Sequence, residues 1–143
     1  MRDMMNKINP VCLFPPLAAQ TNSNTARTSE IIDLRGYNAC TLVLINGTNT
    51  DADATFAVTI AESNDSGMSG SNAVDAADLI GTTTLAGFDY SHDKKCRKLG
   101  YRGSKRYIQV TVTPTGNNAG DWFMAGVAIL GEPDMGATPN PPT

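Results

Sequence analysis

Three cysteines and a single histidine carry the most reactive side chains of this 143-residue sequence. Cys12, Cys40 and Cys96 lie far apart and form no C-x-x-C pair, whereas structural zinc sites take four ligands at close paired spacing. His92 stands in the polar run of residues 91–94, where a solvated turn histidine is favoured over a general base. We therefore expect no bound metal, no cofactor and no catalytic centre built on these residues.

Two carboxylate pairs and a glycine-containing segment suggest other chemistry, but none of them makes a complete motif. Asp51 and Asp53 begin like a calcium loop, yet Phe56 occupies the position of the turn glycine. Asp89 and Asp93 could serve a glycosidase only at a separation that spacing in the sequence does not fix. Residues 100–105 resemble a phosphate-binding loop, but a strand pattern rather than a helix follows them. The sequence thus predicts a protein that is not an enzyme.

The surroundings of the cysteines favour bonds between chains. Cys96 is flanked on both sides by cations, which stabilise a reactive thiolate. Cys12 lies in an N-terminal segment with the character of an arm, and Cys40 at the edge of an apolar strand is the most suited to be a buried thiol. We expect inter-chain disulfides with Cys12 and Cys96 as the first candidates and Cys40 as the third. The alternative is that all three are reduced and packed as small hydrophobes.

Positive charge is concentrated in one short stretch. Seven of the eleven Lys and Arg residues lie within residues 94–106, whereas residues 36–93 hold none and carry eight acidic residues. Such a cluster either solvates an outer face or binds a partner, and Tyr101 and Tyr107 within it would suit nucleic acid. The net charge of −3 opposes nucleic acid and favours an acidic protein surface as partner. The predicted basic patch consists of Lys94, Lys95, Arg97, Lys98, Arg102, Lys105 and Arg106.

Both ends of the chain lack the periodicity of a helix or a strand. Residues 1–27 contain Pro10, Pro15 and Pro16 and then a polar run, which predicts an extended arm. The apolar residues that this arm would present to a partner are Leu13, Phe14 and Leu17. Residues 132–143 predict a proline-rich, exposed tail.

The residues between the arms have the periodicity of strands. Residues 55–62 and 106–113 alternate between apolar and polar, which is typical of half-buried strands. Residues 41–46 are almost continuously apolar, which predicts a strand buried on both faces. In the apolar strand expected at 122–130, Gly126 would let a bulky side chain approach closely. With further short strands at 30–34, 85–90 and 95–101 and one short helix within 73–80, the sequence predicts an all-β domain over residues 28–131. About eight strands would form an antiparallel β-sandwich or a jelly-roll-like barrel.

No targeting or membrane segment is expected. The apolar patch near the N-terminus is interrupted by Pro15 and Pro16, and Asp3 stands where a signal peptide would be basic. No segment approaches the roughly 20 apolar residues of a membrane helix. We expect a protein made in a cytoplasm without a membrane partner.

Five motifs, in their order and spacing, resemble a small virion protein of tailed bacteriophages. They are IIDLRGYN at 31–38, DADATFAVTI at 51–60, LIGT at 79–82, KLGYRGSKRY at 98–107 and VAILG at 127–131. The resemblance implies a capsid decoration or cement protein that is β-rich, often trimeric and seated on the outer capsid where major capsid proteins meet. It implies the major capsid protein and further copies of the chain itself as partners.

Two other functions stay open beside capsid decoration. One is a neck, tail or spike-base component of a virion. The other is a carbohydrate- or receptor-binding module that would use the loops at 46–53 and 63–72, although neither loop carries a Trp or Tyr as a sugar platform.

Overall fold

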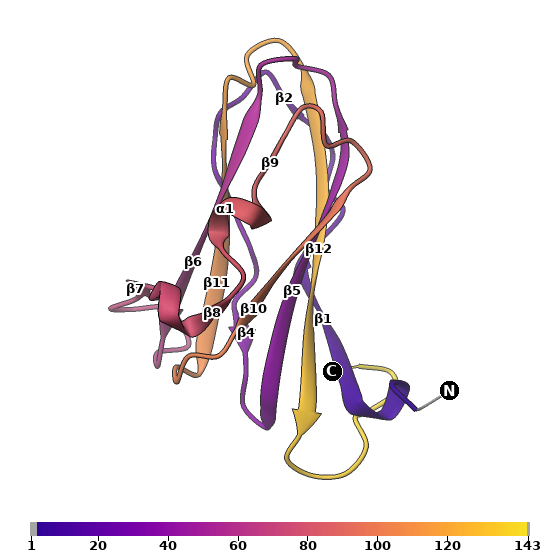
Figure 1. Cartoon of the computed structure of the whole chain (residues 1–143), viewed down its shortest axis with the longest axis vertical. Coiled ribbons are helices and arrows are strands. Elements are labelled where there is room, and N and C mark those ends of the chain that lie inside the picture. Colours follow the sequence, from indigo (N-terminus) through magenta and orange to yellow (C-terminus); the bar gives the residue numbers. More distant parts are fainter. Residues whose placement is uncertain (1–2, 143) are drawn as a thin grey trace.

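Two antiparallel sheets pack face to face with their apolar sides together, as Figure 1 shows. The computed structural model describes residues 3–142. The prediction of an all-β sandwich is confirmed, and the two sheets do not close into a barrel. Alternation places Phe56, Val58 and Ile60 in the core, and each is at most 4% exposed.

Sheet A contains the longest strands of the molecule. Its strand order is β1-β12-β5-β10-β8, and β2 pairs with β12 beside this path. The bounds are β1 (Ile8–Phe14), β2 (Gln20–Thr21), β5 (Tyr37–Asn49), β8 (Leu79–Ile80), β10 (Cys96–Tyr101) and β12 (Asp121–Pro133).

Sheet B is built around the long antiparallel pairing of β6 with β11, which are far apart in the sequence. Its strand order is β3-β11-β6-β7, with β4 paired to β11 and β9 paired to β6. The bounds are β3 (Arg27–Thr28), β4 (Ile32–Asp33), β6 (Thr55–Ser63), β7 (Asn72–Ala73), β9 (Phe88–Asp89) and β11 (Tyr107–Thr115).

The helices of the described residues are single turns. They are the 3-10 turns η1 (Met5–Lys7) and η2 (Ala76–Asp78) and the helix α1 (Thr83–Ala86). The strand predicted at 85–90 is therefore wrong in its first half, because Thr82 caps α1 by accepting a hydrogen bond from Leu85 N at 3.1 Å. The short helix expected within 73–80 is reduced to η2. No helix in the described part of the chain is long and apolar enough to cross a membrane.

The predicted N-terminal arm is part of sheet A instead. Residues 8–14 form β1, which pairs antiparallel with β12, and Leu13 and Phe14 are buried in the core of their own chain. The missing side chain of Gly126 makes room for them, since a Cβ there would lie 3.0 Å from the ring of Phe14. Pro10 is compatible with this strand, because β1 lies at the edge of the sheet and Pro10 is exposed.

The C-terminal segment is tied to the N-terminal one rather than wholly exposed. The strand β12 continues to Pro133, beyond the predicted end of the domain at residue 131. Farther on, Thr138 is buried, and its hydroxyl donates to the Ile8 carbonyl at 2.7 Å. Figure 1 shows the described C-terminal segment close to η1 and β1.

The apolar run at 41–46 is buried on one face only. In β5, Leu42 and Leu44 are buried, whereas Val43 is half-buried and Ile45 is 41% exposed. The prediction of a strand buried on both faces is wrong, because no layer within the described residues covers the second side of sheet A.

Candidate functional site

The outer face of sheet A is made by residues that alternate away from the core in four neighbouring strands. Because the strands are in antiparallel register, their outward side chains form cross-strand rows. One row holds Pro10, Ile129, Thr41 and Gly100, the next holds Cys12, Val127, Val43 and Lys98, and a third holds Ala125, Ile45 and Cys96. Lys98 is the single charged residue in these three rows.

Neighbouring positions extend this apolar surface. Phe123 is 42% exposed, and Ile80 on β8 is exposed above Gly100. A Cβ on Gly100 would come within 2.9 Å of Ile80 Cβ, so a glycine at this position lets Ile80 lie flat on the sheet. We call the three rows together with Phe123 and Ile80 the apolar face.

The outer face of sheet B provides an internal comparison. Its rows pair Thr59 with Thr111, Thr55 with Thr115 and Ala61 with Gln109. One sheet therefore shows hydroxyls and amides to solvent while the other shows Val, Ile and Phe. Both sheets bury an apolar inner face in the core. Formation of the core therefore does not explain why the outer face of sheet A is apolar and that of sheet B is polar.

The size of the apolar face is comparable to that of known interaction patches. The face is four strands wide, with neighbouring strands about 4.8 Å apart, and about seven residues long in the direction of the strands. These dimensions give it an area of roughly 400 Å². The largest apolar patch on a typical monomeric protein covers about 300–600 Å² and often has a binding role. The apolar face lies within this range.

Leu17 belongs to this face, unlike the other two apolar residues of the predicted arm. It lines a shallow hollow of about 200 Å³ together with Ile45 and Phe123. Leu17 is 57% exposed, whereas Leu13 and Phe14 are buried inside the sandwich and cannot contact a partner. Of the predicted partner-binding residues Leu13, Phe14 and Leu17, only Leu17 is accessible.

The cysteines lie in two environments. Cys12 and Cys96 are exposed on the apolar face, at β1 and β10, with β12 and β5 between them. Three strand spacings place these two cysteines about 14 Å apart, beyond the roughly 7 Å that a disulfide can span between Cα atoms. A disulfide that joins Cys12 to Cys96 must therefore link two molecules. Cys40 is buried, and burial raises the pKa of its thiol to about 12.

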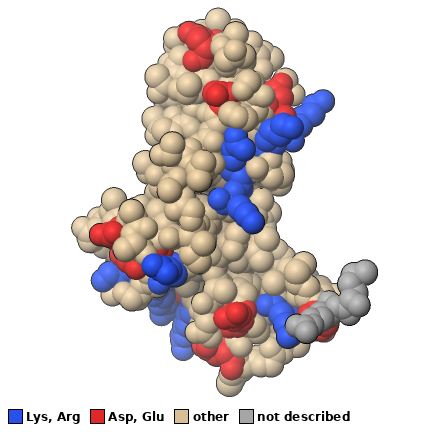
Figure 2. All heavy atoms as spheres, in the orientation of Figure 1, with Lys and Arg blue, Asp and Glu red and all other residues tan. Residues whose placement is uncertain are grey.

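The seven predicted basic residues do not form one patch, because β10 separates them. Lys94, Lys95 and Lys98 lie at or near the start of this strand, and Arg97 turns away to donate from Nε to the Gly87 carbonyl at 3.2 Å. Figure 2 shows the Lys and Arg side chains on the face in view in separate groups. The second group, past the end of β10, consists of Arg102, Lys105 and Arg106.

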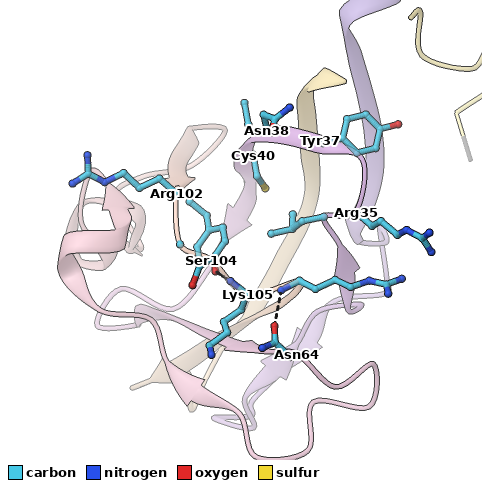
Figure 3. Close-up of a pocket in the computed structure, with 13 residues that line it drawn as sticks. Arg35, Tyr37, Asn38, Cys40, Asn64, Arg102, Ser104 and Lys105 are labelled. Carbon is cyan, nitrogen blue, oxygen red and sulfur yellow. Dashed lines mark hydrogen bonds between the residues drawn. The ribbon is translucent and has the colours of Figure 1, made fainter. Parts of the chain in front are cut away.

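This second group borders a cavity of about 440 Å³ at one end of the sandwich. Tyr101 fixes the loop around it: its hydroxyl donates to Glu62 Oε2 at 2.7 Å and accepts from Lys105 N at 3.0 Å. Burial together with the Glu62 contact raises the pKa of Tyr101. Figure 3 shows Arg35, Arg102 and Lys105 extending outward around the cavity.

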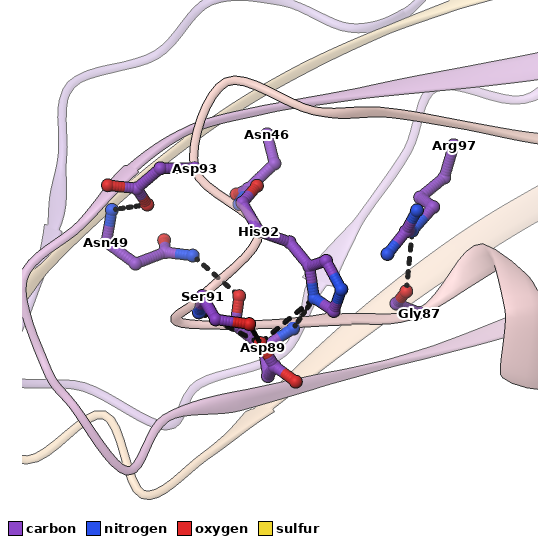
Figure 4. A network of polar contacts seen from close by, with 8 residues as sticks. All are labelled: Asn46, Asn49, Gly87, Asp89, Ser91, His92, Asp93 and Arg97. Atoms are coloured by element: carbon purple, nitrogen blue, oxygen red, sulfur yellow. Dashed lines mark hydrogen bonds and ion pairs between the residues drawn. The ribbon is translucent and has the colours of Figure 1, made fainter.

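His92 is part of a network that holds the loop between β9 and β10. Its Nδ1 lies 2.9 Å from Asp89 Oδ1, and its carbonyl accepts a hydrogen bond from Asn46 Nδ2 at 2.8 Å. Asp93 accepts from Asn49 N at 2.8 Å, as Figure 4 shows. The hydroxyl and backbone of Ser91, with the His92 charge as a smaller cause, lower the pKa of Asp89. The pair Asp89 and Asp93 thus stabilises a turn.

Asp51 likewise caps a turn. Its Oδ2 accepts hydrogen bonds from Asn118 N at 2.8 Å and Ala119 N at 2.7 Å. These two contacts join the loop after β5 to the loop before β12. Within residues 3–142, no three His, Cys, Asp or Glu side chains are grouped to hold a metal ion.

Comparison with known proteins gives weak structural likenesses only. No family model and no curated protein matches the chain. A chain of endo-1,4-beta-D-xylanase 10B from Clostridium thermocellum, which contains CBM22-1 and GH10 modules, is similar with TM-score 0.44 and 12% identity, over 92% of this chain and 27% of that one. A chain of infectious bursal disease virus, Gx strain, gives TM-score 0.47 and 10% identity, over 86% and 32%.

A third likeness is to a chain of the cyanophage Pam1 capsid, with TM-score 0.40 and 12% identity, over 88% of this chain and 83% of that one. The chain spans at most 32% of the first three similar structures. Viral capsid chains and xylan-binding modules both occur among the similar structures, so these likenesses do not decide between the two classes.

Proposed function

We propose that this chain is a structural virion protein that decorates a bacteriophage capsid, with the apolar face of sheet A as its docking surface. The observation that carries the proposal is the difference between the two outer faces, one apolar and one rich in Thr. The resemblance of the five sequence motifs supplies the class of partner, the major capsid protein.

The free energy of burying the apolar face is close to the free energy that association costs, so polar contacts at its edge must contribute to binding. At about 25 cal/mol per Å², covering roughly 400 Å² contributes about 10 kcal/mol. The loss of translational and rotational freedom on association costs roughly 4–15 kcal/mol. The free energy gained by apolar contact is therefore close to the free energy lost on association. Polar contacts around the face must add the remaining affinity.

Several copies of the protein bound together would provide part of the remaining affinity. In the proposed arrangement the protein forms a trimer on the outer capsid and bridges neighbouring major capsid protein subunits. Each further attachment then becomes an intramolecular event, which raises the overall affinity without any new kind of contact. Cys12 and Cys96 stand on the docking surface, where a disulfide to another chain would hold the assembly together.

The test compares lysine substitutions on the two outer faces. In Val43→Lys with Val127→Lys, two charges enter the centre of the apolar face, whereas Thr59→Lys with Thr111→Lys places the same charges on sheet B. Sedimentation with capsids built from the major capsid protein encoded with this chain measures binding. We expect at least a tenfold loss for the first variant and less than a twofold change for the second. Equal losses, or no loss in the first variant, would contradict the proposal.

A carbohydrate-binding module is the second candidate, and one hollow favours it. A space of about 440 Å³ beside the loop at 63–72 is lined by polar side chains such as Asn64, Asp65 and Asn72, which suit hydroxyl groups. No aromatic residue lines it to stack on a sugar ring. Saturable binding to a glycan array, lost in Asn72→Ala and kept in Val43→Lys with Val127→Lys, would favour this candidate over capsid decoration.

A further inference from the structure

The cavity at the end of the sandwich has the features of a binding site separate from the apolar face. It opens between the first residues of β5, the turn after β4 and the loop that joins β10 to β11. Leu34, Cys40 and Tyr101 are among the residues that line it, so part of its surface is apolar. Its volume of about 440 Å³ lies within the range of ligand sites and is too small for a long polyanion.

The charged side chains that line this cavity are all cations. Four cations line it, namely Arg35, Arg102, Lys105 and Arg106, and no Asp or Glu is among the lining residues. This arrangement is unexpected in a chain whose net charge is −3. It provides an electrostatic field suited to an anion at this end of the molecule.

Two of these cations are already engaged and two are available. Arg106 makes a two-point ion pair with Asp33, at 2.9 and 2.7 Å, and Arg102 donates from Nε to the Ala77 carbonyl at 2.9 Å. Among the residues that the structure describes, neither the Arg35 guanidinium nor the Lys105 ammonium has an ion-pair partner. Both can bind a carboxylate without first giving up a contact.

The loop that carries Lys105 is held in place before any ligand binds. The Tyr101 hydroxyl accepts the Lys105 backbone N–H, and Asn64 Oδ1 accepts the Arg106 N–H at 3.3 Å. Gly103 packs directly against the Tyr101 ring, where a Cβ would clash. Little conformational entropy is therefore lost at this loop when a ligand binds.

We propose that this cavity binds an acidic segment of a partner protein, with one carboxylate at Arg35, a second at Lys105 and a neighbouring apolar side chain against Leu34. The mixture of apolar lining and unpaired cations favours such a peptide over a simple anion. This inference goes beyond the capsid docking proposed above and does not depend on it, because the cavity and the apolar face are separate surfaces.

The test uses the isolated full chain and amide chemical shifts in solution. The probes are an acetylated Leu-Glu-Leu-Glu peptide, the matching Leu-Gln-Leu-Gln peptide and inorganic phosphate. The acidic peptide should give saturable shifts at residues 34–40 and 101–106. The neutral peptide should bind at least tenfold more weakly, because it lacks the charge. Phosphate binding as tight as that of the acidic peptide would reduce the site to a general anion site and overturn the proposal.

Matched charge reversals separate a local site from an effect of net charge. Lys105→Glu and Arg35→Glu should each weaken the acidic peptide at least fivefold. Lys95→Glu, at the opposite end of β10, changes the net charge by the same amount and should alter the affinity less than twofold. Arg35 is exposed and pairs with no carboxylate among the described residues, so its variant should keep the fold even if Lys105→Glu does not. Equal effects from Lys95→Glu, or no saturable shifts at all, would contradict the proposal.

Discussion

At the scale of single residues, the three cysteines show what burial does to one kind of side chain. Cys40 is enclosed by the core, which disfavours the charged thiolate and raises its pKa to about 12. Cys12 and Cys96 are exposed on the apolar face and face away from their own core. The same chemical group is therefore inert in one place and accessible in the other two.

This difference predicts two rapidly modified thiols and one slow one. In the native protein a thiol reagent should label Cys12 and Cys96 quickly and Cys40 only on unfolding. Non-reducing gels of particles, with free thiols blocked at lysis, should show linked chains that Cys12→Ser or Cys96→Ser reduces and Cys40→Ser does not. A protein that runs only as a monomer without reductant would exclude the inter-chain disulfide.

Asp33 gives a prediction for the dependence of stability on pH. The hydrogen bonds from Arg106 lower the pKa of the Asp33 carboxyl in the folded state. A carboxyl with a lowered folded pKa stabilises the protein above its unfolded pKa of about 3.9, and the contribution is lost as pH falls through the folded pKa. Because both side chains are more than 40% exposed, solvent screening keeps the contribution of the pair small.

Urea unfolding of Asp33→Asn at two pH values measures this contribution. The variant should be less stable than the wild type at pH 7, and the difference should disappear near pH 2. Glu30→Gln is the control, since no ion pair of Glu30 occurs among the described residues. A deficit in Asp33→Asn that stays constant down to pH 2 would mean that the ion pair is not its cause.

At the scale of elements, β1 decides what the N-terminal segment does. The sequence predicts an arm over residues 1–27 because prolines interrupt the pattern, but an edge strand needs hydrogen bonds on one side only and accepts Pro10. For residues 41–46 the sequence predicts too much burial. A continuous apolar run indicates a strand buried on both faces, but β5 is covered on one face only. The neighbouring apolar run in β12 carries the same signal, and the two together could have revealed an apolar outer face.

The place of β1 in the core predicts opposite results for two leucines four positions apart. Leu13 is fully buried, so Leu13→Ala should lower the free energy of unfolding by about 2–5 kcal/mol. Leu17 is exposed, so Leu17→Ala should change it by less than about 0.5 kcal/mol and weaken capsid binding instead. Chemical denaturation of both variants provides the measurement. Equal stability of the two variants would restore the prediction of an arm that is independent of the sandwich.

At the scale of the whole molecule, the strand periodicity and the spacing of about eight short strands were sufficient to predict the sandwich. It was not sufficient to predict which face each sheet shows to solvent, because that depends on the register between β1, β12, β5 and β10. The basic cluster illustrates the same limit: Lys95 and Lys105 are near in sequence, but β10 places them at opposite ends. The cavity beside Lys105 combines residues from three separate parts of the chain, which spacing in the sequence does not bring together.

A reconstruction of the capsid with this protein bound would show which face of the molecule docks. We expect Val43, Ile45 and Val127 to lie within about 4 Å of a capsid subunit, with the Thr-rich face of sheet B toward solvent. A particle in which the apolar face of sheet A points to solvent, while another surface contacts the capsid, would contradict this expectation.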